Sequence, residues 1–111
     1  MKRTTPQRID DIKEQVEKII KATEGKILHQ FEEDYVLSAA VLRWFEIIGE
    51  ATKYVPNELK LKYPDIPWRQ MAGMRDIAIH DYADLKLDRI WKTIRQDIPK
   101  LKKQIEEIEL S

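Results

Sequence analysis

Apolar residues at helical spacing fill the C-terminal part of the sequence, and they constrain its fold more than any other feature. The pattern mostly advances in steps of three or four residues, and its members are Leu87, Ile90, Trp91, Ile94, Ile98, Leu101, Ile105 and Ile108. Such spacing places the apolar side chains on one face of an α-helix. Pro99 falls inside the pattern, and we expect a kink there because proline cannot donate a helical hydrogen bond.

The N-terminal segment carries a shorter pattern of the same kind, formed by Ile9, Ile12, Val16, Ile19 and Ile20. We expect this helix to begin with Thr5 as its cap and Pro6 in its first turn, because proline is well suited to the start of a helix. Gly25 is expected to end it. The residues from Lys26 to Asp34 show no clean period and are predicted to be a connection.

A second helix is predicted from about Glu33 to Val55, with Pro56 ending it because a residue before proline disfavours the helical conformation. Its apolar stripe is unusually wide and comprises Val36, Leu37, Ala40, Val41, Trp44, Phe45, Ile47, Ile48, Ala51, Tyr54 and Val55. A helix with so wide a stripe is either central to a bundle or shared with a partner molecule.

The remaining segments complete an all-α plan. Residues Asn57 to Lys62 are predicted to form one short helical turn, and Pro67 is well placed to start a third helix from Trp68 to about His80. Residues Asp81 to Lys86 would then link it to the last helix. We therefore predict a single domain over residues 1–111, a bundle of four main helices plus a short helical turn.

The composition excludes several classes of function. The 111 residues include 20 Lys and Arg and 20 Asp and Glu, so the net charge is zero although 36% of the residues are charged. A broadly basic nucleic-acid-binding surface is therefore not expected. There is no cysteine, which excludes disulfides, thiolate zinc sites and a cysteine nucleophile. We also expect no membrane span, and the cytoplasm is the expected location.

Two residue types limit the possible chemistry further. The only histidines are His29 and His80, which cannot supply a familiar zinc pattern, so we expect no metal site. The three glycines are isolated, so a phosphate-binding glycine loop is absent. We interpret Gly49 and Gly73 as positions of close helix packing, since both fall within predicted helices.

One segment combines residues with catalytic potential. The residues from Met71 to Tyr82 place Arg75, Asp76, His80 and Tyr82 around one predicted helix end. Arginine presents a planar fork that suits phosphate, and histidine transfers protons near neutral pH. Asp76 could orient the His80 ring or pair with Arg75. Composition alone leaves a simpler interpretation open, because such residues at a helix end are often solvated or capping groups.

Further strings in the sequence decide between these interpretations. Residues Ile47 to Ala51 read Ile-Ile-Gly-Glu-Ala, and the segment Tyr63–Asp76 contains Pro-Trp-Arg followed by Ala-Gly-Met-Arg-Asp. Together with Arg75, Asp76, His80 and Tyr82, these strings make the chain resemble the HepT-like branch of the HEPN superfamily from about Ile9 to Leu101. The family often has Phe-Gly after the motif tyrosine, whereas this chain has Ala-Asp-Leu.

The resemblance implies a homodimer through the helical bundle, with Arg75 and His80 of both protomers in a shared cleft. It implies a metal-independent ribonuclease without cofactor, acting as the toxin of a type VII-like toxin–antitoxin pair. One His80 could act as base and the other as acid, while Arg75 stabilises the charge on phosphorus. Asp76 and Glu50 are assigned supporting roles. Glu50 is either a partly buried acid near the cleft or an exposed helix residue.

The resemblance also implies a partner, a minimal nucleotidyltransferase antitoxin that transfers adenylyl groups to Tyr82. Added bulk and negative charge at that position would block RNA. A second function remains open, in which the chain is a non-catalytic helical adaptor that binds and regulates the nucleotidyltransferase. Lys53 and Arg69 could contact RNA phosphates, although solvated surface positions are the simpler interpretation.

Overall fold

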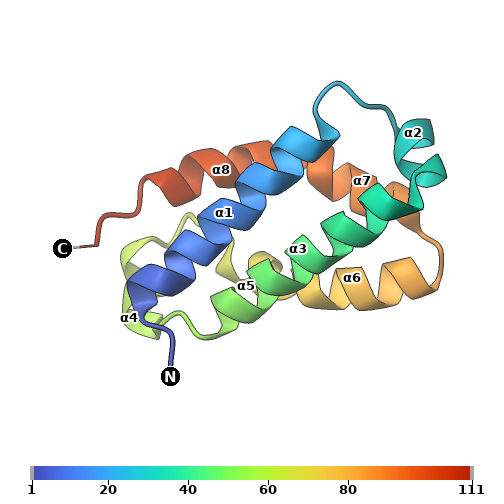
Figure 1. Cartoon of the computed structure of the whole chain (residues 1–111). Helices are drawn as coiled ribbons and strands as arrows, with labels where there is room; N and C mark the ends of the chain where they lie inside the picture. The colour runs from blue at the N-terminus through green and yellow to red at the C-terminus, as the bar shows by residue number, and fades with distance from the viewer. Residues whose placement is uncertain (1, 111) are drawn as a thin grey trace.

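The computed structural model describes residues 2–110, and within this range the chain is all-α with no strand (Figure 1). The helices are α1 (Thr5–Thr23), α2 (Leu28–Glu33), α3 (Tyr35–Lys53), α4 (Asn57–Lys62), α5 (Trp68–Ala72), α6 (Met74–Ala83), α7 (Leu87–Gln96) and α8 (Ile98–Glu106). The predicted fold class is confirmed. None of these helices is both long and apolar enough to cross a lipid bilayer.

Helix α3 lies between α1 on one side and α6 on the other, and α8 packs against the opposite flank of α1 (Figure 1). The core contains the side chains that periodicity predicts, such as Ile12 of α1, Phe45 and Ile48 of α3, and Ile98 of α8. Of the two settings predicted for this helix, central to a bundle or shared with a partner, the structure shows the central one. The helix is slightly shorter than predicted. It begins at Tyr35 because the Asp34 side chain caps it by accepting a hydrogen bond from the Leu37 amide at 3.0 Å.

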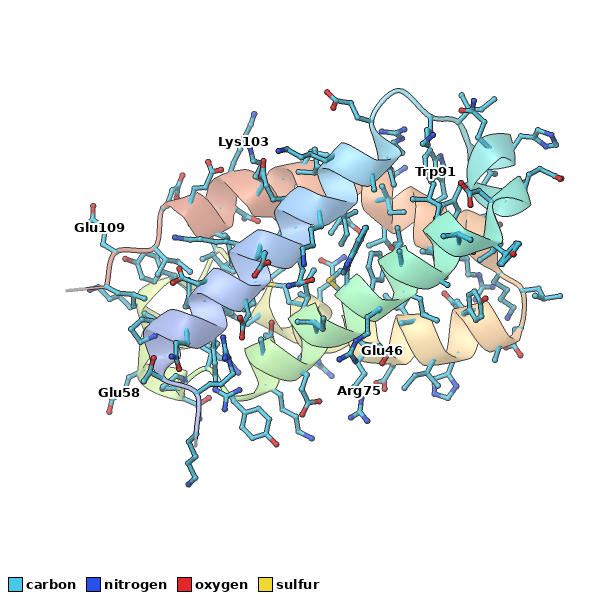
Figure 2. The ribbon with its side chains drawn as sticks, viewed as in Figure 1. Glu46, Glu58, Arg75, Trp91, Lys103 and Glu109 are labelled. Carbon is cyan, nitrogen blue, oxygen red and sulfur yellow. The ribbon has the colours of Figure 1, made fainter. Side chains whose placement is uncertain are left out.

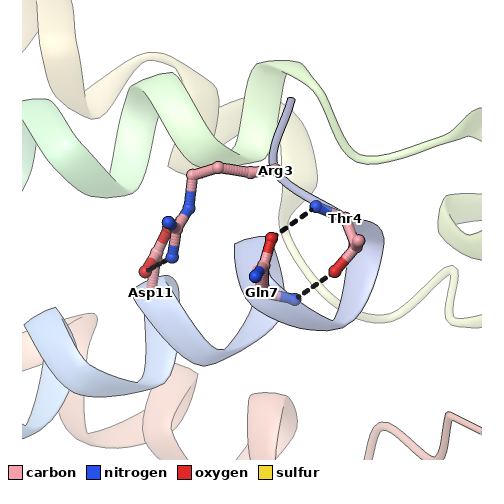
Figure 3. Close-up of polar contacts among 4 residues, drawn as sticks. All are labelled: Arg3, Thr4, Gln7 and Asp11. Carbon is pink, nitrogen blue, oxygen red and sulfur yellow. Dashed lines mark hydrogen bonds and ion pairs between the residues drawn. The ribbon is translucent and has the colours of Figure 1, made fainter. Parts of the chain in front are cut away.

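The start of α1 differs from the prediction by one residue. Thr4 is the cap, and its hydroxyl accepts a hydrogen bond from the Gln7 amide at 3.2 Å. The Gln7 side chain accepts one in return from the Thr4 amide at 2.8 Å (Figure 3). This reciprocal capping box satisfies two amides at once, which Thr5 could not do. The predicted end is confirmed, since Gly25 follows the helix with a φ of 71°.

The segment predicted as a connection contains the short helix α2. It buries Phe31, whose ring lies 5.2 Å from that of Trp91 on α7. A six-residue helix with one buried side chain has no recognisable period, which explains why the sequence pattern missed it.

The predicted third helix is divided into α5 and α6 at Gly73, and α6 continues to Ala83. The predicted link from Asp81 is therefore wrong in its first residues. Met74 and Ala78 are buried and Tyr82 is half-buried, so one row of α6 at four-residue spacing stays against the core through the extra turn. Leu85 follows in a left-handed conformation and ends the helix.

The last predicted helix bends where expected, and it is observed as α7 and α8. The break falls at Asp97, which places Pro99 in the first turn of α8, where the missing amide hydrogen costs no hydrogen bond. All predicted apolar positions of this segment are buried except Leu87, which is partly buried.

The predicted close packing at Gly49 is confirmed. A Cβ atom added there would lie 2.8 Å from both the Cβ and the backbone nitrogen of Arg75. No side chain fits between α3 and the first turn of α6 at this point. Gly73 is different, because it lies at the α5–α6 junction rather than inside one helix, with its nearest neighbours at 3.4 Å or more.

We predict that Gly49→Ala lowers the free energy of unfolding by about 1–3 kcal/mol, because the added methyl group forces α3 and α6 apart. Chemical denaturation measures this loss. Gly73→Ala is the matched control, since its backbone is already helical with a φ of −73°. It should leave stability unchanged or raise it by about 0.5–1 kcal/mol. Equal destabilisation by the two substitutions would contradict this role for Gly49.

Candidate functional site

Helix α6 carries the residues that the sequence singled out. Arg75 and Asp76 lie in its first turn, and His80 and Tyr82 lie in its last turn. Met74 and Ala78 face the core; Asp76 and His80 fall on the opposite side of α6, whereas Arg75 lies on the flank beside α3, and all three side chains are exposed. The motif therefore spans a continuous helix rather than a frayed helix end. Arg75 and His80 remain about 140° apart around the axis, and both are open to solvent.

Glu50 of α3 is the ion-pair partner of Arg75. Its Oε2 atom lies 3.8 Å from Nη1 of Arg75, and both side chains are about half exposed, at 50% and 51%. Of the two predicted settings, the structure thus shows an exposed acid, but one that lies directly beside Arg75. An exposed pair at this distance contributes at most about 1 kcal/mol to stability. The contact therefore adds little to the stability of the fold.

Asp76 is not brought into contact with the other motif residues. Within residues 2–110, it makes neither a hydrogen bond nor an ion pair with Arg75 or His80. Its carboxylate lies in the first turn of α6, where a negative charge is favourable beside the positive end of the helix dipole. The structure thus supports a local electrostatic role and shows no contact that would orient the His80 ring.

Tyr82 is half-buried, and its ring packs against the edge of the core. The preceding residue, Asp81, lies 3.9 Å from the guanidinium of Arg89 on α7. The Asp81 carbonyl also accepts a hydrogen bond from the Lys86 amide at 2.6 Å. These contacts hold the end of α6 against the start of α7. Sequence reasoning had placed Asp81 in a link and did not identify this role.

Two surface hollows meet at the Arg75–Glu50 pair. One has a volume of about 430 Å³ and extends from Arg75 along α3 toward the start of α1. Arg43 of α3 and Arg8 of α1 line it. The other has a volume of about 420 Å³ and contains Lys53, Arg69 and Asp76. Figure 2 shows Arg75 and Glu46 projecting from the same side of the molecule, away from Lys103 on α8. Arg75 is thus flanked by positive side chains in both directions.

The basic residues of these hollows differ in how visible they are in the sequence. Lys53 and Arg69 are near the recognised strings, and the structure places both beside Arg75. Arg8 and Arg43 were not identified, because they come from separate helices and no spacing links them to the motif.

The remaining candidates lie outside this region. His29 is exposed on α2 and lines neither of these two hollows. Across the part of the chain that the structure describes, no group of three or more His, Asp or Glu side chains could hold a metal ion. On α6, Arg75 is suited to bind negative charge and His80 to transfer protons.

Comparison with known families identifies relatives of most of the chain. The family model described as "Ribonuclease HepT-like" matches residues 12–108, which include all four motif residues of α6. No solved structure matches the chain at a significant level.

Several curated proteins are similar over most of their length. A protein of Thermococcus cleftensis named "Probable ribonuclease HepT" is 43% identical over 108 residues, covering 97% of this chain and 98% of the relative. A provisionally named RNase of Methanocaldococcus jannaschii is 38% identical, covering 86% of this chain and 88% of that protein. A third, from Caldanaerobacter subterraneus, is 41% identical over 90% of this chain and 89% of its own length.

Proposed function

Because the chain belongs to the HepT-like ribonuclease family, we propose that it is an RNA endonuclease whose active site is centred on Arg75 and His80. The observation that carries this proposal is the exposure of both side chains on one continuous helix, α6. Beside Arg75, Arg43, Lys53 and Arg69 supply positive charge along the two adjoining hollows. Such charge favours the phosphates of a nucleic acid.

The proposed reaction uses the 2′-hydroxyl of the substrate as the nucleophile and needs no metal. One His80 imidazole removes the 2′-hydroxyl proton, and the oxygen attacks the adjacent phosphorus. Arg75 stabilises the negative charge of the five-coordinate phosphorus. A second, protonated imidazole donates a proton to the leaving 5′-oxygen. The bond between phosphorus and the 5′-oxygen breaks, and the products are a 2′,3′-cyclic phosphate and a free 5′-hydroxyl.

Two imidazoles in one site require two copies of the chain, because the only other histidine, His29, lies on α2 and not on α6. We therefore propose a homodimer in which both copies contribute His80. Exposed apolar side chains support this arrangement. Ile79 of α6 is 44% exposed next to His80, and Val36 of the neighbouring helix α3 is 64% exposed. A second copy covering Ile79 would bring the two copies of α6 together.

We predict that Ile79→Glu converts the protein to a monomer and abolishes RNA cleavage, because it puts a charge in an apolar contact. Light scattering reports the mass, and circular dichroism reports the fold. Leu61→Glu is the matched control, since Leu61 is 79% exposed on α4. It should stay dimeric and active. A wild-type protein that is monomeric while it cleaves RNA at full rate would contradict the dimer.

We predict that His80→Ala lowers the rate of RNA cleavage by about 10²–10⁴-fold, because proton transfer to and from the substrate is lost. Mapping of product ends should reveal a 2′,3′-cyclic phosphate with the wild-type protein. Retention of activity in a chelator tests metal independence in the same assay.

The control for that substitution is His29→Ala, which removes the other exposed histidine and should cleave at the wild-type rate. Equal rates for His80→Ala and wild type would rule out the mechanism. A purified protein that binds a nucleotidyltransferase but never cleaves RNA would instead support the non-catalytic adaptor.

We propose further that the chain is the toxin of a toxin–antitoxin pair and that a nucleotidyltransferase antitoxin inactivates it by adenylylating Tyr82. Tyr82 lies two residues after His80 in the last turn of α6, and its half-buried ring is held in place by the core edge. A phosphodiester attached to its hydroxyl would add negative charge and bulk beside the site. Both effects oppose the approach of RNA phosphates.

Incubation of the wild-type protein with that nucleotidyltransferase and ATP is predicted to add the mass of one or more adenylyl groups. Tyr82→Phe should gain none, because it lacks the accepting hydroxyl, and intact-protein mass spectrometry measures the difference. Tyr35→Phe is the control, since Tyr35 is 77% exposed on α3 and should not affect labelling. Labelling of Tyr82→Phe to the wild-type level would contradict the assignment.

A further inference from the structure

The hollow that extends from Arg75 along α3 concentrates arginine in a chain whose charges otherwise balance. Four arginines and three acidic residues line it, and they come from the N-terminal segment, α1, α3 and α6; they are Arg3, Arg8, Arg43 and Arg75 with Asp11, Glu46 and Glu50. The whole chain has 20 basic and 20 acidic residues. Tertiary packing has therefore gathered a local excess of positive charge next to the proposed catalytic arginine.

The arginines of this hollow are not equally committed to their acidic partners. Arg3 holds Asp11 through two hydrogen bonds of 2.6 Å, as Figure 3 shows for this pair. Arg43 lies 3.7 Å from Glu46, and this pair makes no hydrogen bond. The Arg75–Glu50 pair is similar, at 3.8 Å. Loose exposed pairs contribute little free energy, so a phosphate can replace the carboxylate as the partner of Arg43 or Arg75.

An aromatic ring flanks the same hollow. The Arg8 guanidinium carbon lies 4.4 Å from the centre of the Tyr54 ring, and Tyr54 is 55% exposed. Arg43 and Glu50 of α3 and Tyr54, the residue that caps its C-terminal end, follow one another at spacings that keep them on one side of the helix. At about 1.5 Å per residue, Arg43 and Tyr54 are separated by about 16 Å along α3, with Glu50 between them. Arginine and tyrosine planes of this kind stack against unpaired bases.

We propose that this hollow, which adjoins Arg75 at one end, is a binding subsite for single-stranded RNA. Arg43 binds a phosphate near the one that Arg75 contacts, and the Arg8–Tyr54 pair stacks against an unpaired base of the same strand. The proposal deepens the endonuclease function and rests on it for the identity of the ligand. A single strand is required because paired bases have no free face to stack on the ring.

The test measures binding and not cleavage. A short fluorescent single-stranded RNA is titrated with the His80→Ala protein, which keeps the hollow but does not cut the probe, and anisotropy gives the Kd. Adding Arg43→Gln should weaken binding by about 3–10-fold. It should also lower the slope of log affinity against log salt by about 0.7, the value for one lost phosphate contact on a single strand. Tyr54→Leu should weaken binding without changing that slope.

The matched control is Lys18→Gln in the same background, because Lys18 is an exposed cation of α1 paired with Glu14 at 3.3 Å and lines a different hollow. It should bind RNA like the His80→Ala protein. Equal affinities for Arg43→Gln and its parent, an unchanged salt slope, or no measurable binding by the parent would each overturn the subsite. Failure of the wild-type protein to cleave RNA would reject the endonuclease function instead, so the two failures are distinguishable.

Discussion

The close approach of α3 and α6 at Gly49 determines where the candidate site lies. A side chain at this position would collide with the Cβ atom and backbone nitrogen of Arg75, so only glycine permits the contact. The next residue along α3, Glu50, is thereby placed beside the Arg75 guanidinium. Because Met74 and Ala78 of α6 are buried in the core, the rotation of α6 about its axis is fixed, and so is the direction of its exposed side. The positions of Arg75 and His80 relative to α3 follow from this packing.

The packing of α1, α3 and α6 reconciles the neutral charge of the chain with a nucleic-acid substrate. A protein with equal numbers of acidic and basic residues has no broad field to attract RNA. Packing α1, α3 and α6 together nevertheless gathers Arg8, Arg43 and Arg75 around one hollow. The acidic partners of Arg43 and Arg75 lie at 3.7 Å and 3.8 Å, so both arginines are loosely paired. Local affinity for a strand can therefore coexist with low general affinity for nucleic acid.

The helices that the sequence predicted well are those with a long buried face. The periodic residues of α1, α3, α7 and α8 are mostly buried in the core, and the bend near Pro99 is present. The errors fall where local signals are short. Helix α2 buries a single phenylalanine, and the predicted helix from Trp68 divides at Gly73. The cap of α1 is Thr4 because Gln7 reciprocates its hydrogen bond, a pairing that lies one residue before the expected cap.

The sequence by itself determined the all-α class, the family resemblance and the Arg75–His80 motif, because helical periodicity and motif spacing are properties of residues near one another in the chain. Only the tertiary structure decided that Glu50 lies beside Arg75 and that Arg8 covers Tyr54. It also decided that Arg43 shares a hollow with Arg75. These contacts join helices that are far apart in sequence, and their geometry depends on how closely two backbones approach, which no local pattern encodes.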